Sequence, residues 1–571
     1  MSEQVERSKN EIIKENSRQL RGSILTDLQS ESPEFSEDSQ QLLKFHGMYQ
    51  QDDRDVRKAK NSDGTPKGKT HIVMIRARIP GGNMTAEQFL GILDLSEQYG
   101  NGAMRLTTRQ GIQLHYIPKG NTKEVVKGIN DTMLTTLAAC GDVNRNVMAC
   151  PAPFKDQPHA AIQKLAYEMA EHFRPKTTAY HELWLTDGEG NNHNATEEFV
   201  PVEEPIYGTH YLPRKFKMAI ALPDDNCIDV YANDLGLIAD VQEGQIVGYN
   251  MLVGGGMGRT PAAEKTFPAV GKKLCYVTPE QVIPVAEAVV KVQRDFGNRS
   301  DRKVARLKYL IHNWGLDAFR AKVEEYYGQP LTPPNSVDVK GVEDHVGWFE
   351  QGDGKLFVGI NIECGRVRDT SEVQVKTGLR AIIEKYRMPV RATALQGLIL
   401  CDIDPADRAD ITAMLKQYGL KSAEELTILR RFAIACPALP TCGLSLTESE
   451  RVLPGVIDQL DIEMARLGLQ SEKISVHMTG CNNGCARPYT PDIGFVGRSL
   501  GKYTMFVGGN PEGSRLAFMY EDYVPLEKLV PTLVPLLTGY KADRMPGEGF
   551  GDYCVRLGIE GLKELATQVA V

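Results

Sequence analysis

The feature that most constrains the fold is an internal repeat. Residues 105–111 (RLTTRQG) match residues 391–397 (RATALQG) at an arginine, a threonine, a glutamine and a glycine, with a spacing of 286 positions. At the same spacing, the Cys-Pro-Ala run 150–152 matches 436–438. One short match arises by chance, whereas several at a single spacing indicate a duplication. The chain is therefore predicted to contain two related halves, roughly 71–330 and 350–571.

Each half begins with the same predicted elements. A strand, a helix and a second strand follow one another, at 71–79, 85–100 and 104–117 in the first half and at 355–365, 375–386 and 390–403 in the second. The strands are indicated by apolar residues that alternate or cluster, and the helices by apolar residues at three- and four-residue spacing. Thr85 is a candidate N-cap of the first helix, and Gly100 a candidate stop.

Composition limits the classes of function. The 571 residues are 42% hydrophobic and 25% charged, which is typical of a globular protein of three or four domains. A net charge of -8 predicts no general attraction to nucleic acid or to membranes. No segment approaches the ~20 apolar residues of a membrane span. The N-terminal residues 1–20 mix acids and bases without an apolar core, so we expect no leader peptide and a cytoplasmic location.

The eleven cysteines fall into two groups. Seven stand alone in mostly apolar surroundings and are predicted to be buried small hydrophobic residues: Cys140, Cys150, Cys227, Cys275, Cys364, Cys401 and Cys554. The other four form Cys436-x5-Cys442 and Cys481-x3-Cys485, with prolines and glycines beside them that favour tight loops.

Four thiolates in such loops point to an iron–sulfur cluster, because soft sulfur ligands match iron and their charge balances the cluster. Structural zinc is a weaker alternative, since zinc knuckles prefer a C-x2-C spacing. The spacing of ordinary ferredoxins is absent. Unrelated buried thiols and a disulfide pair are the remaining alternatives.

With these motifs, the sequence resembles the siroheme-dependent sulfite and nitrite reductases. The resemblance covers essentially the whole chain and includes FHGMYQQDDRD (45–55), RARIPGG (76–82), RLTTRQ (105–110), DVNRNV (142–147), YLPRKFK (211–217), LVGGG (252–256), FGNRSDRK (296–303), MTGCNNGC (478–485) and GEGFGD (547–552). It is strongest with the haemoprotein subunits that work beside an NADPH-oxidising flavoprotein.

The resemblance implies two cofactors, a siroheme and a [4Fe-4S] cluster. It implies that Cys436, Cys442, Cys481 and Cys485 bind the cluster, and that Cys485 also bridges to the siroheme iron. It implies further that Arg76, Arg145, Lys215 and Lys217 bind sulfite, and that Arg105 and Arg109 help to hold the siroheme carboxylates. The implied partner is an NADPH-dependent FAD/FMN flavoprotein. A ferredoxin-dependent sulfite or nitrite reductase is the alternative.

The implied fold is α+β, with duplicated ferredoxin-like halves related by a pseudo-two-fold axis. The expected parts are an N-terminal extension (1–70), a central domain (71–138 with 347–423) and two α/β domains. The first α/β domain (139–346) would carry the basic residues, and the second (424–571) the cysteines.

The basic residues suit the reaction that the resemblance implies, which is the six-electron reduction of sulfite to sulfide. Sulfite is partly a dianion near neutral pH, and arginine and lysine offset its charge. Lys215 and Lys217 are candidate proton donors, and Arg76 and Arg145 are candidates for polarising the S–O bonds. Without the resemblance, the alternation of Arg76 with Arg78 and of Lys215 with Lys217 on strand faces favours a solvated strand edge. The glycines of 254–258 lack a full dinucleotide-binding motif, so we interpret them as a loop that approaches the cofactor or the partner domain.

Overall fold

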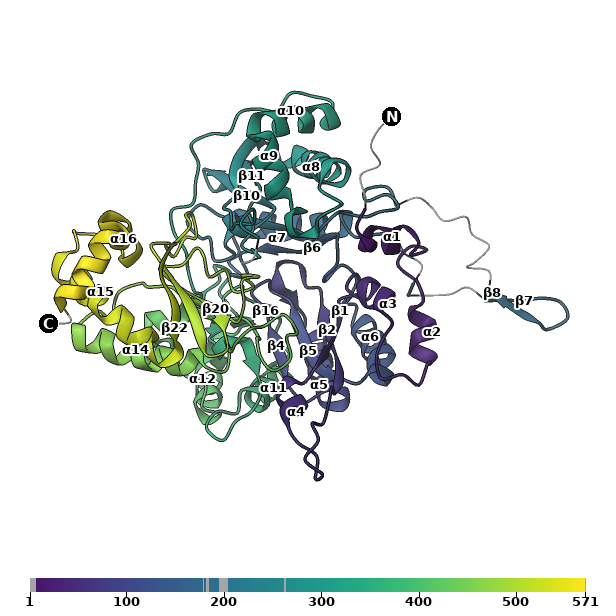
Figure 1. Ribbon diagram of the computed structural model, residues 1–571, viewed down its shortest axis with the longest axis horizontal. Helices are drawn as coiled ribbons and strands as arrows, with labels where there is room; N and C mark the ends of the chain where they lie inside the picture. Colours follow the sequence, from purple (N-terminus) through teal and green to yellow (C-terminus); the bar gives the residue numbers. More distant parts are fainter. Residues whose placement is uncertain (1–6, 178, 181–183, 195–203, 261–262, 570–571) are drawn as a thin grey trace.

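A computed structural model describes residues 7–177, 179–180, 184–194, 204–260 and 263–569. Two central sheets, two outer sheets and a small hairpin make up the β-structure of these residues (Figure 1). The first six residues of the N-terminal segment lie outside the described part. Within the described part, no helix is both long enough and apolar enough to cross a membrane.

The first central sheet has the strand order β1-β2-β5-β4-β15, and its neighbours are antiparallel. Its strands are β1 (Met48–Asp52), β2 (His71–Ala77), β5 (Ile112–Ile117), β4 (Met104–Leu106) and β15 (Arg366–Val367). The predicted extension therefore supplies an edge strand, β1, to this sheet. Helices α5 (Ala86–Tyr99) and α6 (Thr122–Asp131) pack against it through a shared apolar core.

The second central sheet has the order β13-β14-β17-β16-β3. Its strands are β13 (Gly347–Glu350), β14 (Leu356–Ile360), β17 (Leu398–Ile403), β16 (Val390–Ala392) and β3 (Asn83–Met84). Helices α11 (Val375–Tyr386) and α12 (Arg408–Gln417) contribute to the same core as α5 and α6. Each central sheet includes one short strand from the other half, β15 or β3, so the halves are interlocked.

The predicted helices are confirmed at their ends. The Thr85 hydroxyl accepts a hydrogen bond from the Gln88 N–H at 3.2 Å, and the Gln88 side chain accepts one from the Thr85 N–H, which together form a capping box. Helix α5 ends at Tyr99, and Gly100 follows it. Helix α11 matches the predicted range 375–386.

The closing strand of each half differs from the prediction, because it is a hairpin. In the first half the strand predicted at 104–117 is divided into β4 and β5 by a turn at 107–111. The Thr107 hydroxyl accepts the Gly111 N–H at 3.1 Å inside this turn, and Gln110 has a φ of 56°. Thr393 and Gln396 repeat both features between β16 and β17. The strand-like alternation of residue types continues through the turn, so the sequence pattern did not reveal that the strand is interrupted there.

The two outer sheets have the same topology. The first runs β6-β9-β10-β11-β12 and the second β18-β19-β20-β21-β22, each with three parallel strands followed by two antiparallel ones. The first contains β6 (Asn144–Ala149), β9 (Phe216–Ala221), β10 (Leu235–Gln242), β11 (Gln245–Val253) and β12 (Lys272–Val277). The second contains β18 (Ala433–Ala435), β19 (Val476–Thr479), β20 (Ile493–Ser499), β21 (Lys502–Val507) and β22 (Phe518–Pro525).

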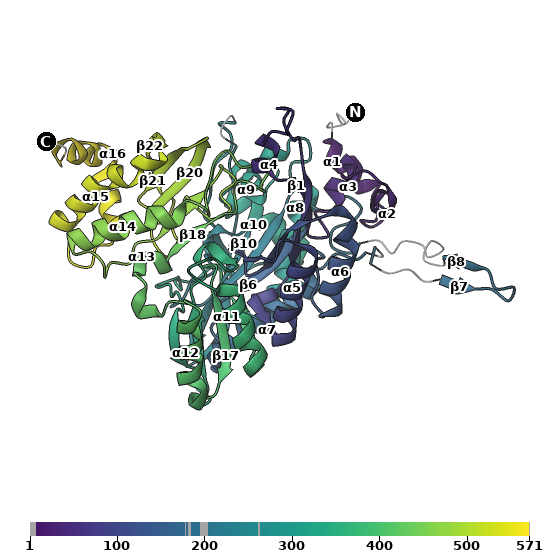
Figure 2. The ribbon, with the colours of Figure 1, turned by 90° about the horizontal axis from the view of Figure 1, so that it is seen from below.

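Helices cover the outer sheets and the N-terminal flank. Figure 1 shows α8 (Val282–Phe296), α9 (Leu307–Trp314) and α10 (Leu316–Tyr327) over the first outer sheet. Figure 2 shows α14 (Leu453–Leu467), α15 (Leu529–Asp543) and α16 (Phe550–Val569) around the second, at the end of the molecule away from α1, α2 and α3. The remaining helices are α1 (Lys9–Glu15), α2 (Ile24–Gln29), α3 (Glu37–Leu42), α4 (Arg54–Lys58), α7 (Gln157–His172) and α13 (Ile428–Arg431), and β7 (Trp184–Thr186) pairs with β8 (Asn192–Asn194).

Candidate functional site

The four cysteines of the predicted cluster site meet at one edge of the second outer sheet. Cys436 directly follows β18, and Cys481 and Cys485 follow the neighbouring parallel strand β19. Carboxyl ends of parallel strands share an edge, which brings these loops together. The sulfurs are close enough to act on one another: a charge on Cys485 raises the pKa of Cys436, Cys442 and Cys481.

The thiols are suited to binding metal. Burial is the main reason that the pKa of Cys481 rises to about 12, and it also raises the pKa of Cys436 and Cys442. Buried thiols of this kind ionise when a metal replaces the proton. The Gly480 N–H donates to the Cys436 sulfur at 3.3 Å, and the Asn483 amide donates to the Cys481 sulfur at 3.4 Å. Cys485 is the exposed member.

The spread of these sulfurs favours a cluster over a single ion. Among the described residues, one group of Cys, His, Asp and Glu has all its ligand atoms within 4.8 Å of one another, and it lies elsewhere in the molecule. A single zinc ion requires its ligand atoms to be that close. The four cysteines are not such a group, so their side chains as they stand do not enclose a single ion, whereas a multi-iron cluster takes more widely spaced ligands.

Three basic residues of the predicted anion site lie on or beside two adjacent strands of the first outer sheet. Lys215 lies just before β9 and Lys217 within it, and Arg145 lies on the adjacent strand β6. Burial and the guanidiniums of Arg145 and Arg214 lower the pKa of Lys215 to about 7, whereas Cys485 acts in the opposite direction. The pKa of Lys217 is lowered by burial, by Arg109 and by Lys215. Lys215 is therefore near Cys485, and Lys217 and Arg145 are near Lys215.

The lysines have no counter-ion in the part of the chain that the structure describes. No carboxylate there forms an ion pair with Lys215 or Lys217, although both are partly buried. The Arg145 guanidinium donates to the Gly141 carbonyl at 3.4 and 3.5 Å and also contacts the Tyr49 hydroxyl, but it forms no ion pair with a carboxylate among the described residues. Arg76 donates to the Cys140 sulfur at 2.6 Å from strand β2. Positive charge without a partner is costly to bury, so the arrangement suits an anionic ligand.

Arg105 and Arg109 are placed differently from each other. The Arg105 side chain is buried and donates to the Glu450 carboxylate and to the Ala435 carbonyl, both at 2.7 Å, so it supports the strand that leads to Cys436. Arg109 donates to the Asn233 side chain at 2.7 Å and to the Asn146 carbonyl at 2.6 Å. Its Nε has no partner among the described residues, which leaves one donor for a ligand.

Two loops hold the Cys485 segment from the other half. The Thr108 hydroxyl donates to the Cys485 carbonyl at 3.0 Å from the β4–β5 turn. The Arg259 N–H donates to the Asn482 carbonyl at 3.0 Å. A Cβ added to Gly484, whose φ is 62°, would meet Met257 at 2.9 Å. The glycine-rich loop 254–258 therefore packs against the partner domain, which agrees with the interpretation of it as an approaching loop.

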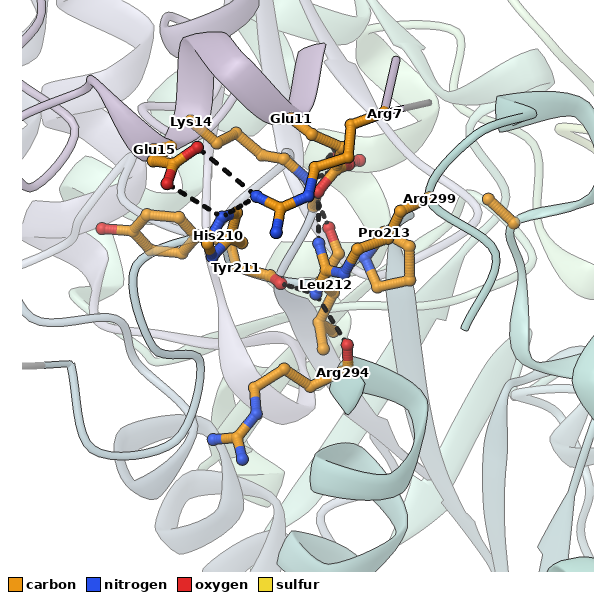
Figure 3. Close-up of polar contacts among 12 residues, drawn as sticks. Arg7, Glu11, Lys14, Glu15, His210, Tyr211, Leu212, Pro213, Arg294 and Arg299 are labelled. Atoms are coloured by element: carbon orange, nitrogen blue, oxygen red, sulfur yellow. Dashed lines mark hydrogen bonds and ion pairs between the residues drawn. The ribbon is translucent and has the colours of Figure 1, made fainter. Parts of the chain in front are cut away.

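Sequence reasoning missed the N-terminal contacts that position the lysines. Lys14 and Glu11 of α1 are buried, and the Lys14 ammonium donates to the Leu212 carbonyl at 2.7 Å (Figure 3). Arg299 donates to the Tyr211 carbonyl at 2.8 Å and pairs with Glu11. The segment that precedes Lys215 is thus held by a buried ionic network. Glu11 and Lys14 lie on a short polar helix, and the sequence there has no apolar pattern that would predict their burial.

Sequence reasoning also missed Cys227. Ala149 pairs with Ile220 across β6 and β9, and Ala435 pairs with Met478 across β18 and β19. Counted from these paired residues, Cys227 and Cys485 are each seven positions further along. The first half thus has counterparts of both Cys436 and Cys485, namely Cys150 and Cys227. The two cysteines were predicted to be isolated hydrophobic residues. They are buried, as predicted, but they are neighbours.

Comparison with known proteins places this geometry among haem and iron–sulfur enzymes. Residues 140–331 match the family described as "Nitrite and sulphite reductase 4Fe-4S domain", and residues 66–131 and 349–418 match the "Nitrite/Sulfite reductase ferredoxin-like half domain". The second match confirms the duplicated central fold. The first covers the basic half and does not reach the four cysteines.

Curated relatives match over nearly the whole chain. A "Sulfite reductase [ferredoxin]" of Synechococcus elongatus is 41% identical over 98% of this chain and 91% of its own. A "Sulfite reductase [NADPH] hemoprotein beta-component" of Geobacillus thermodenitrificans is 42% identical over 96% of this chain and 95% of its own, and that of Staphylococcus haemolyticus is 42% identical over 98% and 97%. The solved structure of the Mycobacterium tuberculosis NirA protein shares the fold, with a TM-score of 0.78, 24% identity and 97% coverage of both chains.

Proposed function

Because the chain belongs to the nitrite and sulfite reductase family, with siroheme and a [4Fe-4S] cluster as its cofactors, we propose that it reduces sulfite to sulfide with six electrons. It is an oxidoreductase, and the proposal specifies its reaction. The single observation that carries the proposal is the position of unpaired lysines beside the exposed Cys485. A soft-ligand redox site and an anion-binding site would therefore lie side by side.

We assign the cluster ligands to Cys436, Cys442, Cys481 and Cys485. Cys485 is the exposed member and influences the pKa of Lys215, so we propose that it would also hold the siroheme iron. When bound, these two groups would supply the electrons and an iron centre for the reduction. The Gly480 and Asn483 donors would set the electron-donating strength of the thiolates.

Arg76, Arg145, Lys215 and Lys217 are assigned to the substrate. Their positive charges offset the repulsion between sulfite and the siroheme carboxylates. Each sulfite oxygen leaves as water, so the site must supply protons. Lys215, with a pKa of about 7, holds and releases a proton readily near neutral pH. Arg145 stays charged and can polarise an S–O bond. Arg109 offers its unpartnered Nε to a cofactor carboxylate.

The proposed electron donor is an NADPH-oxidising FAD/FMN flavoprotein, with this chain as the haem-bearing subunit. The printed names of the 42% identical relatives support this partner, since they describe a beta-component. Ferredoxin is the second candidate, because a relative named for ferredoxin is 41% identical. A cytoplasmic location remains a prediction.

Anaerobic turnover with reduced methyl viologen tests the reaction independently of the natural donor. We expect sulfite to be consumed with sulfide as the product, at a higher kcat/KM than nitrite. A clear preference for nitrite would overturn the substrate assignment. Replacing the dye by reduced ferredoxin, or by NADPH with a flavoprotein reductase, then identifies the donor, and the faster of the two decides it.

A further inference from the structure

We propose that Cys150, Asp225, Cys227 and His345 form a second metal site, which binds one zinc ion. Their four ligand atoms all lie within 4.8 Å of one another. All four residues are buried, with exposed fractions of 0%, 6%, 3% and 6%. Two thiols, one imidazole and one carboxylate make up a complete tetrahedral set for zinc, and a site without an open position is typical of structural zinc.

Three of the six distances between the ligand atoms, those among Cys150, Asp225 and His345, are close to those of a filled site, and the Cys227 sulfur lies within 4.8 Å of the other three atoms. Zinc bonds of about 2.0–2.3 Å give tetrahedral edges of about 3.3–3.8 Å. The Cys150 sulfur lies 3.5 Å from the His345 Nε2, within this range. The Asp225 Oδ2 lies 2.8 Å from the Cys150 sulfur and 2.9 Å from the His345 Nε2. Zinc would therefore need this oxygen to move outward by only about half an ångström, with loss of the thiol protons.

The surrounding contacts already orient the carboxylate. The Asp225 Oδ1 accepts the Cys227 N–H at 2.9 Å and the Glu343 N–H at 3.1 Å, so Oδ2 is the atom left to face the other ligands. His345 is held in the left-handed backbone region, with a φ of 58°. That conformation is uncommon outside glycine and is concentrated at functional positions. Outer contacts of this kind fix ligand geometry in metal sites.

The internal duplication gives independent support. Cys150 follows β6 as Cys436 follows β18, and Cys227 is the register equivalent of Cys485. The tetrad therefore occupies the same sheet edge in the first half that the four cysteines occupy in the second. Its ligand atoms are packed more tightly, with a nitrogen and an oxygen replacing two sulfurs, which suits one ion and not a cluster. His345, from the connection between the halves, completes it.

Zinc analysis of the purified holoprotein tests the proposal. We expect about one zinc per chain, bound firmly enough to survive gel filtration, after expression in zinc-supplemented medium. X-ray absorption at the zinc edge should show two sulfurs at about 2.3 Å and two lighter atoms at about 2.0–2.2 Å. Iron cofactors do not contribute at this edge, and zinc that had replaced the proposed cluster would show four sulfurs.

Two variants test whether the zinc is bound at the proposed tetrad. Cys227→Ser should lose most of the zinc, whereas Cys275→Ser, which alters another buried cysteine of the first outer sheet, should keep it. If Cys227→Ser does not fold, Asp225→Asn takes its place, and the wild-type absorption spectrum still decides. Zinc below about 0.1 per chain in the wild type, a four-sulfur shell, or equal zinc in Cys227→Ser and wild type would overturn the proposal. None of these results depends on sulfite turnover.

Discussion

The Arg487 guanidinium lies 2.9 Å from the Asp229 carboxylate, and the two residues occupy equivalent positions in the two halves. In the first outer sheet Ile220 of β9 pairs with Ala149, and in the second Met478 of β19 pairs with Ala435. Asp229 lies nine positions after Ile220, and Arg487 lies nine positions after Met478. The pair thus joins the halves at their pseudo-two-fold axis. Arg487 also donates to the Thr108 carbonyl at 3.0 Å and stands two residues after Cys485. An ionic contact between the halves therefore anchors the proposed bridging ligand.

We predict that Asp229→Ala destabilises the protein by about 3–5 kcal/mol, because it leaves the Arg487 charge buried without a partner. The double variant Asp229→Ala/Arg487→Met should recover part of this loss, since no charge is then left unpaired. Urea unfolding of the wild type, Asp229→Ala, Arg487→Met and the double variant measures the coupling energy between the two residues. Strictly additive effects would show that the pair does not join the halves.

Lys217→Ala should keep the visible spectrum and the iron content of the wild type, while kcat for sulfite falls about 10²–10³-fold. The reason is the loss of an ammonium group that the bound oxyanion would hold in its charged form. Lys272→Ala, an exposed lysine on β12, is the matched control and should retain full turnover. Full activity of Lys217→Ala in the methyl viologen assay would remove this lysine from the mechanism.

Glu11→Gln should weaken the ionic network that holds residues 211–213. We expect a loss of about 3 kcal/mol and a higher KM for sulfite, because the segment leading to Lys215 loses its support. Glu15→Gln is the control on the same helix, since Glu15 makes only the exposed contacts with Arg7 at 3.5 Å and His210 at 3.4 Å, each worth less than about 1 kcal/mol (Figure 3). A change in stability without any change in KM would limit α1 to a structural role.

Asp142 makes stability depend on pH. Burial opposes its ionisation, but Arg302, which donates to both carboxylate oxygens at 2.8 and 3.2 Å, and Lys14 outweigh burial and hold the pKa of Asp142 below its usual value. A lowered pKa contributes stability above the unfolded value of about 3.9, and this stability is lost as the pH falls through the folded value.

We therefore expect Asp142→Asn to be less stable than the wild type at pH 7 by about 3 kcal/mol, and the difference to shrink below pH 4. Thermal unfolding across pH 3 to 7 checks this, with the exposed Asp317→Asn as a control that should stay within about 0.5 kcal/mol of the wild type. A difference that is constant over this range would contradict the assignment.

The sequence was informative where a pattern is local or repeated. Thr85 and the 375–386 helix follow from capping chemistry and apolar spacing, and the duplication follows from matches at one spacing. That spacing changes from 286 to 258 positions between the first and second strands of the outer sheets, because their connections differ in length. The equivalence of Cys227 and Cys485 was hidden for this reason. The exchange of β3 and β15 is long-range pairing that no local pattern encodes.

Within the site too, positions that follow from strand order could be predicted from the sequence, whereas contacts between residues far apart in the chain could not. The convergence of the four cysteines and the lysines follows from where their strands end. Arg105, in contrast, pairs with Glu450, which is 345 residues away, so its contact with the strand before Cys436 required the tertiary structure. Its proposed contact with the siroheme carboxylates stays a prediction.

The central claim is that Cys436, Cys442, Cys481 and Cys485 hold the cluster. Iron and acid-labile sulfide in anaerobically purified Cys442→Ser test it most directly, with Cys554→Ser, a buried cysteine far along the same half, as the control. We predict that Cys442→Ser loses the cluster iron, its sulfide and sulfite turnover, while Cys554→Ser retains all three. Wild-type iron and sulfide in Cys442→Ser would contradict the account.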